Sequence, residues 1–247
     1  KELASGEHLT ILNKKDALLN ITAKPNAELS AKSTHVAGID LFSPIDKPTM
    51  TGGDFINYGT ATITVVGERG NTHGIIADSA HASTIQNDGK LTIDVTKTAA
   101  DAAYNTFGIK GNHDTTLLNN GSLEITGTST AERWLVGMAL YGTASTHGNF
   151  KNSGTSKVTL KESALPVDPK NGNIFGYHSS WGTGTNTGSM TFDLAGYRST
   201  GMNVDHSSSF LNQGDIAINI KPTDHSSVSS TELNSGLNRA MYVSEST

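Results

Sequence analysis

The sequence predicts an all-β solenoid, a parallel β-helix, and three observations support this prediction. A nine-residue phrase returns three times, as HASTIQNDG at 81–89, HDTTLLNNG at 113–121 and HSSSFLNQG at 206–214. An Asn-x-Gly motif recurs about every 30 residues. The composition, with 26 Gly, 6 Pro, 6% aromatic residues and no Cys, favours short strands and turns over helix bundles or disorder.

The Asn-x-Gly motif marks six repeats. After each Gly, apolar and polar residues alternate, which is typical of a half-buried strand. A second phrase, Gly followed by an apolar residue, runs in step with the motif and opens another strand. The asparagines of the motif are Asn57, Asn87, Asn119, Asn152, Asn186 and Asn212. The glycines of the second phrase are Gly38, Gly74, Gly108, Gly137, Gly176 and Gly201.

A repeat of this length cannot bury its apolar residues alone, so it must stack on its neighbours. In a parallel β-helix each repeat forms one coil, about 4.8 Å from the next, and equivalent residues form columns. The six asparagines are therefore expected to form a structural ladder, with amides that pair from coil to coil. The apolar residue preceding the motif is expected in an inward column formed by Ile85, Leu117, Phe150, Trp181 and Phe210.

These motifs resemble the passenger domains of Gram-negative autotransporters (type V secretion), and most of all the non-proteolytic and self-associating adhesins among them. The resemblance covers residues 35–243. It implies a right-handed, three-sided β-helix of about 7–8 coils at the bacterial cell surface, anchored in the outer membrane by a translocator barrel that this sequence lacks. We expect residues 1–247 to be one β-helix domain of a longer passenger, with residues 1–34 as an N-terminal coil or cap.

The residues expected to bind a ligand occupy turns and outward slots of the strands. Hydroxyl, amide and charged groups at a regular spacing suit the repeating hydroxyls and amides of a glycan chain. The expected binding face carries Asp88, Lys90, Lys110, Asn112, Asp114, Asn120 and Lys157. Two alternatives stay open: the face is only a solvated scaffold, or loops between coils, such as residues 161–173, bind the ligand.

Histidines recur ahead of the motif, at His81, His113, His147, His178 and His206. Stacked histidines could share a metal ion, but no column of Cys or Glu accompanies them. We therefore interpret them as a column of turn residues, and we expect neither a metal nor a cofactor.

The sequence also argues against several other classes of protein. The nucleophile motifs Gly-Asp-Ser-Gly and Gly-x-Ser-x-Gly do not occur, and the clustered carboxylates of β-helix polysaccharide lyases and hydrolases are missing, so we do not expect an enzyme. The net charge of -5 disfavours nucleic acid as a partner. No run of 18 apolar residues occurs, so we expect no membrane insertion by this chain.

The resemblance implies a function in adhesion, with host glycans or extracellular-matrix proteins as partners. The alternative is a self-associating passenger, in which sister molecules pair and cause bacterial aggregation and biofilm. A polysaccharide lyase or hydrolase is the third hypothesis. Dimerisation at high concentration separates the first two hypotheses, and cleavage of a polysaccharide identifies the third.

Overall fold

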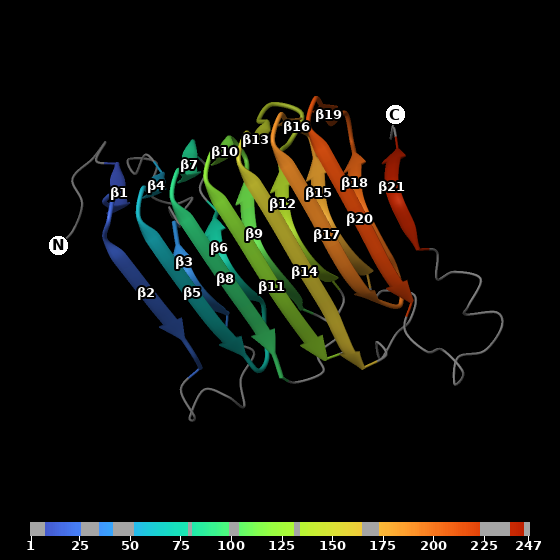
Figure 1. Ribbon diagram of the computed structural model, residues 1–247, viewed down its shortest axis with the longest axis horizontal. Helices are drawn as coiled ribbons and strands as arrows, with labels where there is room; N and C mark the ends of the chain where they lie inside the picture. Colours follow the sequence, from blue (N-terminus) through green and yellow to red (C-terminus); the bar gives the residue numbers. More distant parts are fainter. Residues whose placement is uncertain are drawn as a thin grey trace.

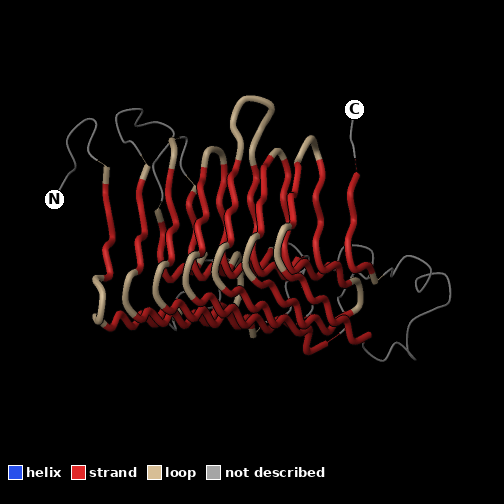
Figure 2. The backbone as a smooth tube through the Cα atoms, turned by 45° about the horizontal axis from the view of Figure 1, so that its top comes forward, coloured by secondary structure: helices blue, strands red, loops and turns tan. Residues whose placement is uncertain are grey.

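The computed structural model describes residues 8–25, 35–41, 52–78, 81–98, 104–130, 134–164, 173–222 and 238–244. These residues form three parallel sheets of seven strands each, and they include no helix (Figure 2). Each turn of the chain contributes one strand to each sheet, so the coils stack side by side along the molecule (Figure 1). The predicted all-β, three-sided parallel β-helix is confirmed, with about seven coils.

The strands follow one another in the order sheet A, sheet B, sheet C. Sheet A contains β1 (Leu9–Asn13), β4 (Gly53–Asn57), β7 (Ser83–Asn87), β10 (Thr115–Asn119), β13 (Gly148–Asn152), β16 (Gly182–Asn186) and β19 (Ser209–Asn212). Sheet B contains β2 (Leu18–Ala23), β5 (Thr60–Gly67), β8 (Lys90–Lys97), β11 (Ser122–Thr130), β14 (Thr155–Ala164), β17 (Ser189–Gly196) and β20 (Asp215–Pro222). Sheet C contains β3 (Val36–Asp40), β6 (Thr72–Ala77), β9 (Asn105–Asn112), β12 (Trp134–Tyr141), β15 (Asn173–Ser180), β18 (Ser199–Asp205) and β21 (Arg239–Ser244).

The expected N-terminal region contributes a regular coil to the sheets. Its strands β1 and β2 pair in parallel with β4 and β5, in the same register as the coils that follow. The rest of the region expected as a cap, residues 1–7 and 26–34, lies outside the described residues.

An asparagine ladder holds the corner between sheets A and B. From Asn13 to Asn186, the Nδ2 of each asparagine in the ladder donates to the Oδ1 of the next at 2.7–2.8 Å, and to the carbonyl oxygen of the first residue of a sheet B strand. Both amide protons are thereby satisfied, although most of these side chains are fully buried. The ladder contains Asn13 and the six asparagines expected from the sequence, Asn57, Asn87, Asn119, Asn152, Asn186 and Asn212.

The core is a set of inward columns that run the length of the solenoid. Phe55, Ile85, Leu117 and Phe150 are at most 1% exposed and stack in sheet A. Equivalent apolar columns from sheets B and C meet them to form one continuous cluster. Dispersion and burial along these columns provide the main stabilisation that each coil lacks alone.

The structure corrects the expected place of Trp181. Gly184, and not Trp181, pairs with Phe150 and with Phe210 in the inward column. The ring of Phe210 occupies the space beside Gly184, and the ring of Tyr177 from sheet C packs 5.3 Å from the ring of Phe150 and 5.5 Å from that of Phe210. Trp181 lies instead in the turn between sheets C and A, with a positive φ of 58°.

A groove on sheet C as the candidate binding site

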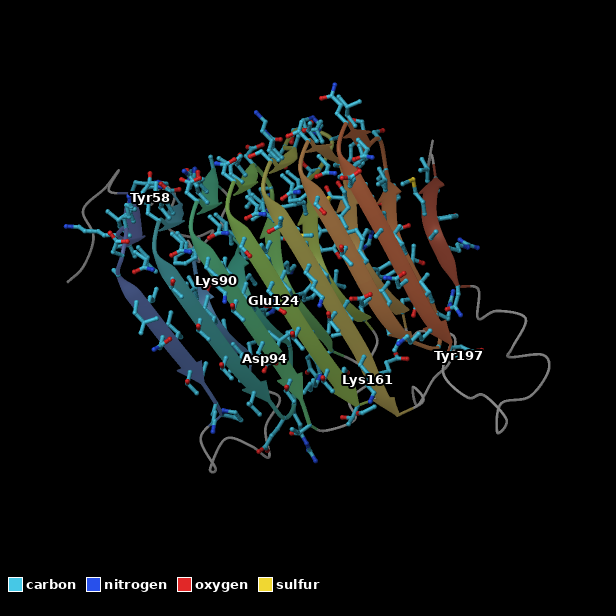
Figure 3. The ribbon with its side chains drawn as sticks, in the orientation of Figure 1. Tyr58, Lys90, Asp94, Glu124, Lys161 and Tyr197 are labelled. Carbon is cyan, nitrogen blue, oxygen red and sulfur yellow. The ribbon has the colours of Figure 1, made fainter. Side chains whose placement is uncertain are left out.

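The seven residues expected on one binding face lie on different sides of the solenoid, so that part of the expectation is wrong. Lys90 and Lys157 are on sheet B, and Asp88 and Asn120 are in the turns that enter it. Figure 3 shows Lys90 with Asp94, Glu124 and Lys161 along this sheet. Lys110 and Asn112 are on sheet C, and Asp114 is in the turn from sheet C to sheet A. The cause is the three-sided coil, because residues some twenty positions apart in one repeat belong to different sheets.

Asp88 and Asn120 form a second, exposed ladder at the corner between sheets A and B. The amide of Asn120 donates to Asp88 at 2.6 Å, and the hydroxyl of Ser153 donates to the amide oxygen of Asn120 at 2.7 Å. The amide of Gln86 also donates to Asp88. These polar groups are engaged with each other, so the corner offers a ligand fewer open partners than the sequence indicates.

Sheet C has an irregular outward surface because the inward–outward alternation of side chains breaks in its strands at the glycine of the Gly-apolar phrase. In β9, a Cβ on Gly108 would point inward, 2.4 Å from the side chain of Ile125, and the following Ile109 is also in the core. The outward residues Phe107 and Lys110 therefore lie on either side of the inward pair Gly108 and Ile109. The Lys110 ammonium lies 5.5 Å from the centre of the Phe107 ring. Glycine recurs at this position in successive coils, so the same arrangement of outward side chains repeats along sheet C.

Two columns of outward side chains line the resulting depression. The first column contains His73, Phe107, Val136, Phe175 and Thr200, and the second contains Ile76, Lys110, Ala139, His178 and Asn203. All except Ile76 and Lys110 are buried, although they point away from the core. Phe107, Val136, Ala139 and Phe175 form a second apolar cluster, with Trp134 and Tyr141 packed on it. Burial of so many outward residues marks sheet C as the concave side of the molecule.

Three hollows follow one another along this surface, which we call the sheet C groove. The N-terminal hollow, of about 430 Å³, lies over β3 and β6 and is lined by His35, Asp40, His73 and Asp78 among others. The middle hollow, also about 430 Å³, lies over β9, β12 and β15. The C-terminal hollow, of about 360 Å³, lies over β15, β18 and β21. The groove therefore runs across the strands, along the axis of the solenoid (Figure 1).

The middle hollow has a rigid, hydrogen-bonded wall. The hydroxyl of Tyr141 lies 3.0 Å from Nδ1 of His178, and Nε2 of His178 lies 3.2 Å from the carboxylate of Asp205. Asp205 also accepts from Asn203 at 3.0 Å and contacts His206 Nδ1 at 2.9 Å. In the neutral imidazole of His178, Nε2 donates to the carboxylate and Nδ1 accepts from the Tyr141 hydroxyl.

Burial and charge explain the titration of this wall. Burial by itself raises the pKa of Asp205, but hydrogen bonds from His178 and His206 and the charges of those residues hold the pKa low, at about 2. Burial, followed by the negative charge of Asp205, raises the pKa of Tyr141. At neutral pH the wall therefore contains an ionised Asp205 and a neutral Tyr141, so the donors and acceptors are fixed before any ligand arrives.

The two ends of the groove differ in charge. At the N-terminal end, burial and then the charge of Asp78 raise the pKa of Asp40. Burial lowers the pKa of His73 to about 3, with smaller contributions from Lys110 and His35. At the C-terminal end the hollow is lined by two cations, Arg198 and Arg239, and the Arg239 guanidinium lies 4.3 Å from the centre of the Tyr242 ring.

The five expected histidines do not form one column. His113 and His206 are equivalent turn residues with positive φ, but Gly142 and Trp181 occupy the same place in the two coils between them. His178 is on β15, in the groove, and His147 contacts the carbonyl oxygen of Trp181 at 3.2 Å. Over the described ranges, no group of three or more His, Cys, Asp or Glu is arranged to hold a metal ion.

Most of the groove residues, including Phe107, Trp134, Tyr141 and Phe175, were not expected at a binding site from the sequence. A signal was present, because a large apolar residue immediately precedes the glycine in TFGI, LVGM and IFGY. In a strand with one solvated face this slot would be polar. A bulky residue there indicates an outward position that is nevertheless covered.

Comparisons with known proteins leave the groove as the main guide to function. In the part of the chain that the structure describes, no helix is long and apolar enough to cross a membrane. No protein-family model, no curated protein and no solved structure matches this chain.

Proposed function

We propose that this protein is a bacterial cell-surface adhesin that binds an extended glycan in the sheet C groove. The observation that carries the proposal is the aromatic lining of the groove, with buried Phe107 and Phe175 below and the half-buried rings of Trp134 and Tyr141 at the rim. Sugar rings have apolar faces that pack on aromatic rings, and their hydroxyls need polar partners beside those rings.

The polar partners are arranged at the spacing of a polymer. Asn105 and Asn112 on β9, Ser180 on β15 and Asp205 on β18 line the middle hollow beside the aromatic side chains. Successive coils are about 4.8 Å apart, which is similar to the length of one pyranose in a polysaccharide. Each coil can therefore contact one sugar, and many weak contacts in series give useful affinity.

This proposal moves the binding site from the flat surface of sheet B to the groove of sheet C. Of the seven residues expected from the sequence, it retains Lys110 and Asn112. Sheet B presents Thr92, Thr126 and Thr159 in outward slots, and the hollow over β14, β17 and β20 contains no aromatic side chain. A hydroxyl that bonds a ligand gives up a hydrogen bond to water, so hydroxyls alone contribute little net binding free energy.

The experiment compares two matched variants of the purified protein on an array of glycans and matrix proteins. Trp134→Ala removes an aromatic ring from the groove, and the triple variant Thr92→Ala/Thr126→Ala/Thr159→Ala removes hydroxyls from sheet B. We expect the groove variant to lose about tenfold or more in affinity for the bound glycan, and the sheet B variant to change it by less than about twofold. Equal melting temperatures for wild type and both variants control for folding.

The reverse pattern would return the site to sheet B. Binding to matrix proteins only, unaffected by Trp134→Ala, would make the ligand a protein and not a glycan. Sedimentation of the same three samples at high concentration addresses self-association, since loss of dimers in the sheet B variant alone would favour that function instead.

A further inference from the structure

Lys110 is the only half-buried lysine that lines the middle hollow, and its charge is not paired. Among the described residues, none forms an ion pair or a hydrogen bond with its ammonium, which has only the Phe107 ring as a close partner, at 5.5 Å. Burial lowers the pKa of Lys110, and the charge of Asp78 offsets part of this effect. The Asp78 carboxylate itself accepts from the amide of Asn112 at 2.6 Å. The ammonium therefore bears a desolvation cost without the ion pair that usually compensates it.

The other charged group that lines the hollow, the carboxylate of Asp205, is not available to pair with a cation of a ligand. The carboxylate of Asp205 already has His178, His206 and Asn203 as partners within 3.2 Å. A ligand that enters the middle hollow thus meets one unsatisfied charge, and that charge is positive.

The hollow, of about 430 Å³, has room for a sugar ring. Ala139 pairs with Lys110 on one side and with His178 on the other, but it is fully buried, and the hollow is lined by the two flanking residues. Two strand steps separate Lys110 from His178, or roughly 10 Å between their backbones. The rings of Trp134 and Tyr141 border the same space.

We infer that the middle hollow is a subsite for a hexuronate, whose ring packs on Trp134 and Tyr141 and whose carboxylate pairs with Lys110. This inference rests on the proposed function and adds the class of ligand. An ammonium on an alkyl stem, held beside an aromatic face, can bind a carboxylate while the sugar ring packs on the neighbouring apolar surface.

The charge distribution along the groove also sets where an acidic polymer lies. Arg239 on β21 is four strand steps from Lys110, roughly 19 Å at about 4.8 Å per step. In a polymer with a uronate at every second sugar, one carboxylate would lie on Lys110, the next over β15 and the one after that near Arg239. Asp40 and Asp78 repel carboxylates at the opposite end, so the polymer extends from β9 toward β21.

The test uses two octasaccharides that differ only in charge. One alternates glucuronate with N-acetylglucosamine, and the other is the same chain with its carboxyl groups reduced to alcohols. Titration calorimetry measures both against wild type, Lys110→Met, Lys110→Arg and the sheet B control Lys157→Met. Wild type, Lys110→Arg and Lys157→Met should bind the acidic chain about tenfold more tightly than the reduced chain, and Lys110→Met should lose most of that preference.

The outcomes separate the inference from the function on which it rests. If wild type binds both chains equally, the uronate subsite is overturned while glycan binding in the groove stands. If Lys157→Met and not Lys110→Met loses the preference, the carboxylate site lies on sheet B and the inference is wrong. If neither chain binds wild type, the inference falls together with the proposed function. The Lys110→Arg variant distinguishes loss of charge from loss of folding.

Discussion

Removal of one asparagine from the middle of the ladder tests whether the ladder stabilises the fold. The side chain of Asn119 is fully buried and makes three full hydrogen bonds. It accepts from Asn87 at 2.8 Å, and its two amide protons go to Asn152 Oδ1 at 2.7 Å and to the Thr155 carbonyl at 2.9 Å, with a longer shared contact to Ser156 Oγ at 3.1 Å. Asn119→Ala removes these bonds and leaves their partners inside the protein.

The expected cost is roughly 3 kcal/mol of unfolding free energy, since each of the three full bonds contributes about 1 kcal/mol net. The neighbours limit the loss, because each keeps one other partner. The amide of Asn87 still donates to the Ser122 carbonyl at 3.0 Å, and Oδ1 of Asn152 still accepts from Ser156 at 2.9 Å. Without these remaining bonds the cost would include two fully unsatisfied buried groups.

Asn212→Ala is the matched control at the end of the ladder. Asn212 is exposed, and its amide donates only to the Gly214 carbonyl, two residues away. Its partner Asn186 keeps a bond to the Asp215 carbonyl at 3.2 Å. Because water can replace the lost bonds, we expect a cost below about 1 kcal/mol.

Urea denaturation of the three proteins measures the difference through the transition midpoint, provided that the slope of the transition is unchanged. A changed slope would mean that the coils unfold separately, as in repeat proteins with weak coupling. If Asn119→Ala costs no more than Asn212→Ala, the ladder follows from the fold and does not stabilise it.

Two further predictions concern the interior of the solenoid. Gly108→Ala should destabilise the protein severely or prevent folding, because its Cβ would lie 2.4 Å from the side chain of Ile125. Gly53→Ala should be tolerated, because the nearest atom to its Cβ is 3.4 Å away. Similar melting temperatures for the two variants would refute this prediction. Burial raises the pKa of Glu162 to about 7, although the backbone N–H of Tyr197 donates to its carboxylate and lowers it. The folded pKa exceeds the unfolded value, so Glu162 stabilises the protein fully below pH 4.5 and loses this contribution, up to roughly 3 kcal/mol, as pH rises through 7. Glu162→Gln should flatten the pH dependence of stability between pH 5 and 8, and an unchanged slope would assign it to other groups.

The sequence by itself determined the coil and its register. Asn87, Asn119 and Asn152 recur with a glycine two residues on, and only stacking of coils gives buried amides partners of their own kind. The ladder was therefore predictable residue by residue, except for Asn13, which is followed by Lys14 and Lys15 and so lacks the motif. Alternation after each motif likewise predicted the strands of sheet B, since period-two patterns require one solvated face.

Only the tertiary structure decided which outward residues share a side of the molecule. Phe107, Val136 and Phe175 are about thirty to forty residues apart in sequence and become neighbours through strand pairing, and the glycines between the outward residues act through packing against the core. Volume compensation is also non-local, because the ring of Phe210 from the next coil fills the space left by Gly184 and the ring of Tyr177 from another sheet packs on it. Periodicity along the chain specifies inside and outside for each strand, whereas the shape of a surface depends on contacts between coils, and these contacts place the groove on sheet C.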